Sequence, residues 1–373
     1  MKRFCKDIDI TDISYIENCI LDFIKNKKRK RICRFFAAAT NKERSKVELC
    51  FSAKNSEFYK IIKEVAIILS QEIKNHNLIL RKVNYYERMC PSTRKMRKIG
   101  VQCTKQQIYD YIVVNALKEM IPSLGRYQCA CLPNRGQEYG VRRIFKWLQN
   151  PEIKYGVKMD IRKCYESIDK ETLMTFLHKK IKNPHLLWLI RTLIDTFDYT
   201  LSIGSYLSQY LCNIFLSQGY HYLSSDKCPA VKHCLFYMDD ILVLGLEKAA
   251  LRKDILSFIK FMKDNLKLDI KENWTLFRIE DFDSIKHSQI VEMMGYRIGR
   301  TKITIRKRIF NRIRKLMNGI EEDLFRRKHV NKKRLIKVPA YKGRILTSTL
   351  SPDNFWKVAK RSQNIISKLN KVK

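Results

Sequence analysis

The sequence has few acidic residues for its length. It contains 37 Asp and Glu against 75 Lys and Arg among 373 residues, which gives a formal net charge of +38. A surplus of this size makes a compact chain repel itself unless a polyanion compensates the charge. A basic character that serves only solubility is the weaker interpretation, because acidic residues improve solubility more than basic ones do. We therefore expect a nucleic-acid partner.

The sequence also lacks long apolar runs, internal repeats and zinc-binding cysteine pairs. No run approaches the about 18 apolar residues that span a bilayer, and the first residues are charged before an apolar signal region could form. The 12 cysteines are scattered, and no C-x-x-C pair meets another at zinc spacing. We expect a soluble, cytoplasmic protein without a membrane partner, in which the cysteines are reduced and mostly buried.

What is present is enough apolar material for two or three domains, since 45% of the residues are hydrophobic. The first part combines basic runs such as KNKKRKRICR with apolar residues at helical spacing. This pattern predicts a basic helical region over residues 1–90, with a core stripe that contains Tyr59, Ile62, Val65, Ile68 and Leu69. We expect residues 91–300 to form a second region and residues 301–373 a third.

The middle of the chain is typical of an α+β fold, in which helices cover one face of an antiparallel sheet. The spacing of apolar residues predicts, in chain order, a strand or hairpin at 94–101, a helix around 141–148, a strand at 154–160, a helix after an N-cap at Asp169, a helix after a turn at Gly204, a hairpin at 232–245 and a helix at 251–266. At 94–101 a plain solvated charged face is an equal alternative.

The end of the chain is the most basic part. Residues 301–373 hold 22 Lys and Arg against 4 Asp and Glu. A helical stripe continues through this segment at Ile309, Ile313, Leu316, Ile320 and Leu324. The simplest interpretation is a small basic helical domain.

Two adjacent carboxylates interrupt an apolar hairpin. Asp239 and Asp240 lie within CLFYMDDILVLG, and Asp160 ends the apolar strand KYGVKMD. A buried charge costs several kcal/mol unless it is paired or bound to a metal. Three carboxylates brought together are suitable ligands for Mg²⁺, and two such ions support in-line phosphoryl transfer. An Asp-Asp pair alone is more often an exposed turn, but the apolar surroundings weaken that alternative here.

Six motifs, in the right order, resemble those of reverse transcriptases. FYMDD at 236–240 is similar to the catalytic hairpin, and MDIRKCYESID at 159–169 to the first catalytic motif. The others are RKMRKIGV at 94–101 for the fingers, IGSYLSQ at 203–209 for the template and nucleotide, LKLDIKENW at 266–274 for a palm lysine, and MMGY at 293–296 for the primer grip. The first 80 and last 70 residues resemble the family only in general character.

This resemblance implies a right-hand polymerase, with fingers and a palm built on an antiparallel sheet and a basic helical thumb at 301–373. It implies RNA-directed DNA polymerase activity, a nucleotidyl transfer, with Asp160, Asp239 and Asp240 as catalytic metal ligands and the carbonyl of Ile161 as a further ligand. The expected cofactors are two Mg²⁺ ions, with Mn²⁺ as the alternative.

The resemblance also assigns residues that contact the nucleotide and its leaving group. Tyr165 matches the steric gate that crowds a ribose 2′-OH, although a tyrosine there is also compatible with core packing. Arg97 and Lys98 match cations of the fingers, and a guanidinium suits a triphosphate because it donates two hydrogen bonds. Lys271 matches the general acid to pyrophosphate, although Lys267 lies close to it in sequence.

Two further groups follow from the same comparison. Template and nucleotide contacts are expected from Ile203, Gly204 and Gln209. The primer grip is expected from Met294, Gly295 and Tyr296, where a glycine lets backbone approach the sugar-phosphate closely.

The template and nucleotide motif departs from the commoner Q-G-x-x-x-S-P form. The I-G-x-x-x-S-Q form, with Ile203 first, resembles the same motif in bacterial and phage reverse transcriptases of diversity-generating retroelements. These enzymes copy a template-repeat RNA into cDNA with errors concentrated at adenine. Replacing an amide by an aliphatic side chain removes a polar contact near the incoming nucleotide, which fits this mutagenesis. Drift in another bacterial lineage is the alternative.

The same subgroup implies the partners and the setting. The partners are the template RNA, the primer or cDNA, dNTPs and a small, basic, oligomeric accessory variability protein. The setting is the cytoplasm of a bacterial or phage-infected cell. The residues after the palm are too few for an RNase H, integrase or endonuclease domain, and no V-T-G tripeptide of retron enzymes occurs. An anti-phage defence or other unclassified bacterial reverse transcriptase is the nearest alternative. A catalytically silent RNA-binding scaffold is a second one, which the three intact aspartates disfavour.

Overall fold

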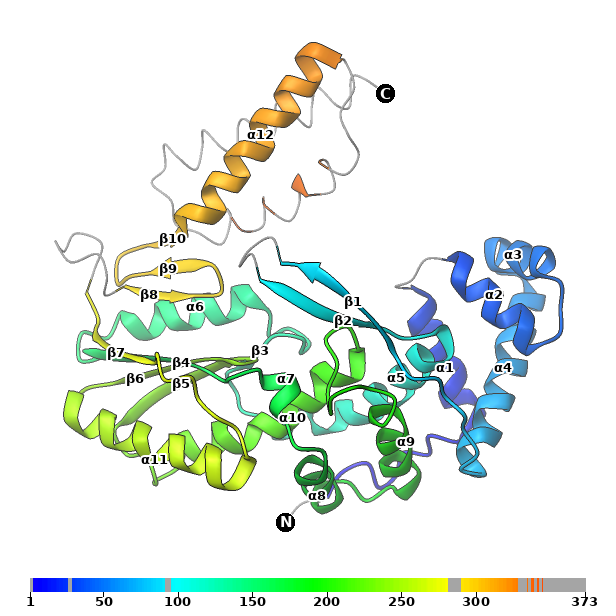
Figure 1. The fold of residues 1–373 in the computed structure, drawn as a ribbon, viewed down its shortest axis with the longest axis horizontal. Coiled ribbons are helices and arrows are strands. Elements are labelled where there is room, and N and C mark those ends of the chain that lie inside the picture. Colours follow the sequence, from blue (N-terminus) through cyan, green and yellow to red (C-terminus); the bar gives the residue numbers. More distant parts are fainter. Residues whose placement is uncertain are drawn as a thin grey trace. The chain divides into compact units, whose positions relative to one another are not determined.

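The computed structural model describes residues 3–25, 29–90, 95–280 and 290–327, with 334, 337, 338, 341 and 344 (Figure 1). These residues fall into two units. The first lies within Met1–Leu132, Ile161–Tyr222 and Ser257–Lys271, and the second within Pro133–Asp160, Leu223–Leu256 and Glu272–Lys373. The division into 1–90, 91–300 and 301–373 stays a prediction, and most of 328–373 lies outside the described residues.

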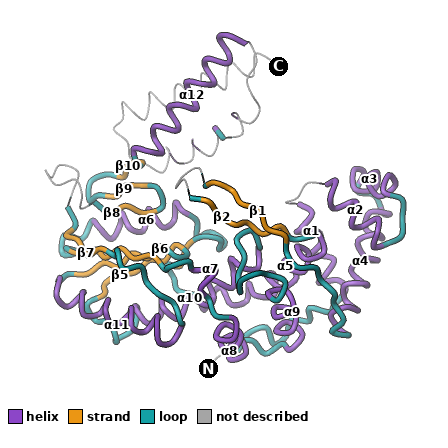
Figure 2. Tube along the Cα trace, viewed as in Figure 1, coloured by secondary structure: helices purple, strands orange, loops and turns teal. Residues whose placement is uncertain are grey.

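The first unit opens with four helices, which confirms the predicted helical region (Figure 2). Their bounds are α1 (Ile13–Lys25), α2 (Arg29–Ala39), α3 (Arg44–Ala53) and α4 (Ser56–Lys74). The Asn55 side chain accepts a hydrogen bond from the N–H of Phe58 and so caps α4. Phe58 faces the core, whereas Tyr59 is 54% exposed. The expected stripe was therefore wrong by one position at this turn, because only one of two successive aromatic residues can face inward.

A hairpin and a buried helix follow in the same unit. Strands β1 (Asn84–Met89) and β2 (Met96–Val101) pair antiparallel, which confirms the strand predicted at 94–101. Next come α5 (Thr104–Leu117), a 3-10 helix (Lys118–Ser123) and the short β3 (Gln128–Cys129). α5 packs against α1, α2 and α9 and is apolar on most sides, as expected of a helix surrounded by others.

Four more helices belong to the first unit wholly or in large part. They are α7 (Cys164–Ser167), α8 (Lys170–Lys180), α9 (Pro184–Ile194) and α10 (Tyr206–Leu223). Asp169 caps α8 by accepting from the N–H of Thr172, as the sequence predicted. α9 was not predicted, although its buried residues Leu186, Leu187, Ile190, Leu193 and Ile194 recur at helical spacing.

An antiparallel sheet organises the second unit. The strands of this sheet that belong to the second unit are β4 (Tyr155–Asp160), β5 (Val231–Tyr237), β6 (Asp240–Gly245) and β7 (Thr275–Arg278), in the order β5-β6-β4-β7. β6 is buried along nearly its whole length, because α6 (Gln137–Leu148) lies on one side of the sheet and the part of α11 (Lys248–Leu266) up to Leu256 lies on the other (Figure 1). The indole of Trp147 stacks on the His233 ring at 4.6 Å, fixing α6 to β5. The fold is therefore α+β with an antiparallel sheet.

A small meander and a long helix complete the second unit. β8 (Val291–Met293), β9 (Tyr296–Ile298) and β10 (Ile303–Ile305) pair antiparallel, and α12 (Lys307–Arg327) follows. The predicted helical stripe is confirmed in α12 at Ile313 and Ile320, but Met317 is buried where Leu316 was expected, because spacings of four and three residues follow the inward face. Among the described residues, no helix is both long and apolar enough to cross a bilayer.

Candidate active site

The pairing of β4 with β6 places two of the predicted carboxylates opposite each other. Asp160, the last residue of β4, pairs in register with Asp240, the first residue of β6. Tyr237 pairs with the same Asp240 across β5, so Met238 and Asp239 alone form the turn. Met238 has a φ of 55°, a left-handed conformation that costs roughly 1 kcal/mol for a residue with a side chain. Backbone strain of this kind is typical of functional sites.

A lysine on the same strand partly compensates this carboxylate pair. Directly opposed like charges destabilise a sheet. Lys158 lies two residues before Asp160, hence on the same face of β4, and its Nζ is 3.7 Å from Oδ1 of Asp240. The same Nζ donates a hydrogen bond of 3.0 Å to the carbonyl of Glu292. Sequence reasoning missed Lys158, although a lone charge inside an apolar strand was the signal.

The donor set of the three aspartates suits hard divalent cations. Their oxygens are the ligand type that Mg²⁺ prefers, and each residue is half-buried. Across the described ranges, however, no three acidic, histidine or cysteine side chains are already grouped as a metal cluster. Carboxylates that converge without a cation repel each other, which favours side chains that point apart. The backbone register thus brings Asp160 and Asp240 opposite each other, and Asp239 is the neighbouring residue in the turn.

The predicted residues that follow Asp160 in the chain belong to the first unit. Ile161 is fully buried and forms a bridge with Ile270, and the N–H of Arg162 donates to the carbonyl of Asp269 at 2.8 Å. These contacts tie the first catalytic motif to the palm-lysine motif. Tyr165 lies half-buried on α7, so its role as a steric gate stays a prediction.

The structure distinguishes the two candidate lysines of the palm motif. Lys267 is bound to Asp169, with 3.0 Å between Nζ and Oδ1. Hydrogen bonds from Thr172 and then from Lys267 lower the pKa of Asp169 to about 2. Lys267 is thus engaged at the cap of α8, and the role of Lys271 as general acid stays a prediction.

The template and nucleotide loop is fixed by its backbone. The carbonyl of Ile203 accepts a 2.8 Å hydrogen bond from the N–H of Gly100 on β2. Gly204 has a φ of +115°, and a Cβ there would lie 2.5 Å from the Gly100 carbonyl oxygen. Only glycine fits this position. Ile203 and Gln209 are half-buried, and their contacts with a nucleotide stay a prediction.

A buried carboxylate that sequence reasoning missed holds the same loop. Oδ2 of Asp110, on α5, accepts hydrogen bonds from the hydroxyl of Ser205 at 2.9 Å and from the N–H groups of Tyr206 and Leu207 at 3.1 and 3.2 Å. Oδ1 accepts from the Gln102 amide at 3.0 Å. Burial raises the pKa of Asp110 to about 6, although these hydrogen bonds lower it. Asp110 therefore orients the start of α10, and an aspartate within IYDYIVV was the signal for it.

Arg97 and Lys98 of the fingers hairpin point to opposite faces, because successive residues of a strand alternate. Lys98 is bound to Asp198, with 2.7 Å between Nζ and Oδ2, and lies 4.9 Å from the centre of the Tyr85 ring. The hydrogen bond that Lys98 donates to Asp198 raises the pKa of Lys98. Arg97 is exposed and has no ion pair with any residue in the described ranges. Arg97 is thus the better candidate for triphosphate binding.

The predicted primer grip is the turn between β8 and β9. Met294 and Gly295 both have positive φ, of 54° and 89°, as a two-residue hairpin turn requires. The Gln137 amide on α6 donates to the Met294 carbonyl. The side chains of Met294 and Tyr296 are both buried, at 7% and 2% exposure, so any contact of this turn with a primer would come from Gly295 or backbone.

The α+β fold, with its antiparallel sheet and carboxylates at adjoining strand ends, is that of a nucleic-acid polymerase palm. Residues 73–298, more than half of the chain, match the family described as reverse transcriptase (RNA-dependent DNA polymerase). The chain belongs to this family.

A solved structure of apo telomerase from Candida tropicalis, truncated from its C-terminal domain, is similar to 60% of this chain at 15% identity, with a TM-score of 0.41. The match covers 54% of that chain, so this protein spans about half of its length. A comparison with curated proteins finds no match.

Proposed function

We propose that this protein is an RNA-directed DNA polymerase that extends a primer on an RNA template by two-metal nucleotidyl transfer. The observation that carries the proposal is the register of Asp160 against Asp240 at the ends of β4 and β6, inside the segment that matches the family. The strongly basic composition supports a nucleic-acid substrate.

The proposed chemistry assigns a task to each residue. Asp160, Asp239 and Asp240 hold two Mg²⁺ ions, or Mn²⁺ in their place, with the Ile161 carbonyl as a further ligand. Such ions stabilise the charge on the attacking and leaving oxygens. The primer 3′ hydroxyl loses its proton to solvent, and its oxygen bonds to the α-phosphorus of the dNTP while the bond from that phosphorus to pyrophosphate breaks. Lys271 donates a proton to the pyrophosphate.

Other residues position the substrates in this proposal. Arg97 binds the triphosphate and Tyr165 excludes a ribose 2′-OH. Lys98 lies on the opposite face of β2, where it is bound to Asp198. The loop at Ile203, Gly204 and Gln209 supports the pairing nucleotide. The turn at Met294, Gly295 and Tyr296 supports the primer end.

The first prediction tests the metal ligands. Asp239→Asn should lower primer extension with Mg²⁺ and dNTPs more than about 100-fold, because it removes a carboxylate that only the reaction needs. Circular dichroism and RNA affinity should stay unchanged, since Asp239 lies in a turn outside the core. Asp226→Asn, an exposed aspartate of the same unit, is the matched control. Full activity of the Asp239 variant would refute the catalytic assignment.

Within the family, we propose the role of a diversity-generating retroelement enzyme, which copies a template-repeat RNA into adenine-mutagenised cDNA with an oligomeric basic accessory variability protein. The support is Ile203 at the start of a loop that β2 and Asp110 hold in place. Because the backbone of this loop is fixed, an isoleucine in place of the commoner glutamine changes the side-chain contacts at position 203 and leaves the backbone of the loop unchanged.

The second prediction tests this subgroup. Ile203→Gln should lower misincorporation opposite template adenine about two- to tenfold, which corresponds to one hydrogen bond. The measurement is sequencing of cDNA made from one RNA template by the parent and the variant. Parent error rates that are low, or equal over the four template bases, would instead favour a defence-type bacterial reverse transcriptase.

A further inference from the structure

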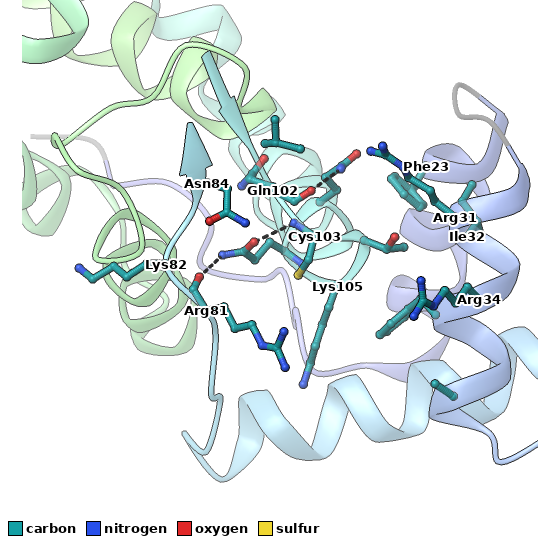
Figure 3. A pocket seen from close by; sticks show the side chains of 16 residues that line it. Phe23, Arg31, Ile32, Arg34, Arg81, Lys82, Asn84, Gln102, Cys103 and Lys105 are labelled. Carbon is teal, nitrogen blue, oxygen red and sulfur yellow. Dashed lines mark hydrogen bonds between the residues drawn. The ribbon is translucent and has the colours of Figure 1, made fainter. Parts of the chain in front are cut away.

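A basic cavity of about 1250 Å³ lies in the first unit (Figure 3). Residues of α1 and α2 form one side, the segment before β1 and the ends of the fingers strands form another, and the first turn of α5 lies between them. Its wall carries five cationic side chains, namely Arg31, Arg34, Arg81, Lys82 and Lys105. Among the described residues that line it, none is acidic. The cavity is therefore a site of positive potential.

Three of these cations are available to a ligand. Lys105 is paired with Glu72, and Lys82 donates to the carbonyl of Asp195 at 2.8 Å. For the side chains of Arg31, Arg34 and Arg81, the described part of the chain provides no hydrogen bond or ion pair. Guanidinium groups gathered without counter-charges raise the energy of the fold until an anion binds between them.

The cavity wall is held in place by hydrogen bonds. The Gln106 amide donates to the carbonyl of Arg81 at 2.8 Å, which joins the segment before β1 to α5. Gln106 also accepts from the N–H of Cys103, and the Gln107 amide donates to the carbonyl of Gln102 at 2.9 Å. Because these groups are fixed before a ligand arrives, less conformational entropy of the cavity wall is lost on binding.

We propose that this cavity binds an unpaired stretch of RNA. Its volume exceeds the about 300–1,000 Å³ of typical small-molecule pockets, so it accommodates a polymer segment. Arginine forks match phosphate oxygens, and the half-buried ring of Phe35 on the wall provides a surface on which a base can stack. The proposal takes RNA as the polyanion from the function proposed above and adds a binding surface in the first unit.

The test compares two double variants of the full chain. Arg31→Ala with Arg34→Ala removes two cavity cations, and Lys63→Ala with Lys179→Ala removes two exposed lysines of the same unit outside the cavity. Fluorescence anisotropy measures binding to a labelled single-stranded RNA of about 15 nucleotides and to a blunt RNA duplex over a range of salt. The cavity variant should lower the slope of log affinity against log salt for the single strand by roughly 1.4, at about 0.7 per phosphate contact. The lysine variant should lower it less.

A second measurement separates this proposal from the polymerase function. Primer extension on a short template reports the catalytic site, so an inactive parent chain would refute the proposed function while the binding comparison still stands. Equal loss in the two double variants, an unchanged slope, or an equal loss for the duplex would overturn the cavity as a site for unpaired RNA. Crosslinking of 4-thiouridine RNA to peptides that contain residues 29–39 or 81–84 would support it.

Discussion

At the scale of single residues, the template and nucleotide loop depends on one buried carboxylate, that of Asp110. Asp110 is fully buried and accepts four hydrogen bonds, three of them from residues 205–207. A buried donor left without an acceptor costs about 1–3 kcal/mol, so several donors depend on this one carboxylate. A residue of α5 therefore fixes the orientation of this loop, although α5 contains none of the family motifs.

This carboxylate should make stability depend on pH. The folded protein keeps the proton of Asp110 up to about pH 6, whereas the unfolded chain releases it near 3.8. The contribution of Asp110 to the free energy of unfolding is therefore complete below about pH 4 and should fall, on the order of 3 kcal/mol, as the pH rises through 6. Asp110→Asn should lack this fall in urea unfolding at pH 4 to 7. Identical pH dependence of parent and variant would contradict it.

At the scale of elements, one side chain connects α6, β4 and the meander. The Arg300 guanidinium, between β9 and β10, donates to the carbonyls of Leu148, Asn150 and Ile153 at 2.6–2.9 Å. The Gln149 amide in turn donates to the Arg300 carbonyl. The loop that leads into β4 is therefore held by the meander, which also carries the predicted primer grip.

Removing this connection should be costly. Arg300→Ala should lower the free energy of unfolding by about 2–3 kcal/mol, because three carbonyls lose a charged donor. Arg308→Ala, at the exposed start of α12, should change it by less than about 0.5 kcal/mol. Denaturant unfolding of both variants provides the measurement, and equal values would show that these hydrogen bonds contribute nothing.

The same elements show how far sequence reasoning reaches. The hairpin at Asp239–Asp240, the strand that ends at Asp160 and the cap at Asp169 were predictable, because alternation and capping are local signals. The meander was not, since strands of three residues are too short to show alternation. The role of Asp110 could not be assigned either, because its partners lie about 95 residues away in the chain.

At the scale of the whole molecule, the charge surplus calls for a polyanion, and part of it lies beyond α12. Residues 328–373 hold 13 Lys and Arg against one acidic residue. Removing them should weaken RNA binding and flatten its salt dependence, because fewer counterions are released. The cut leaves β10 and α12 complete, so the palm should stay folded. Affinity measured over a salt series checks this, and an undiminished slope would locate the RNA surface wholly in the remaining chain.

The order of the strands also has a consequence for how this chain is synthesised. β4 lies between β6 and β7, but β6 begins about 80 residues after β4 ends. At about 5–20 residues per second, a ribosome takes roughly 4–16 s to make that stretch. During this interval the nascent strand has no native neighbour, and an apolar strand with open edges pairs readily with other chains. Lys158 and Asp160 are the charged residues of β4, and charged side chains on an open strand disfavour such pairing.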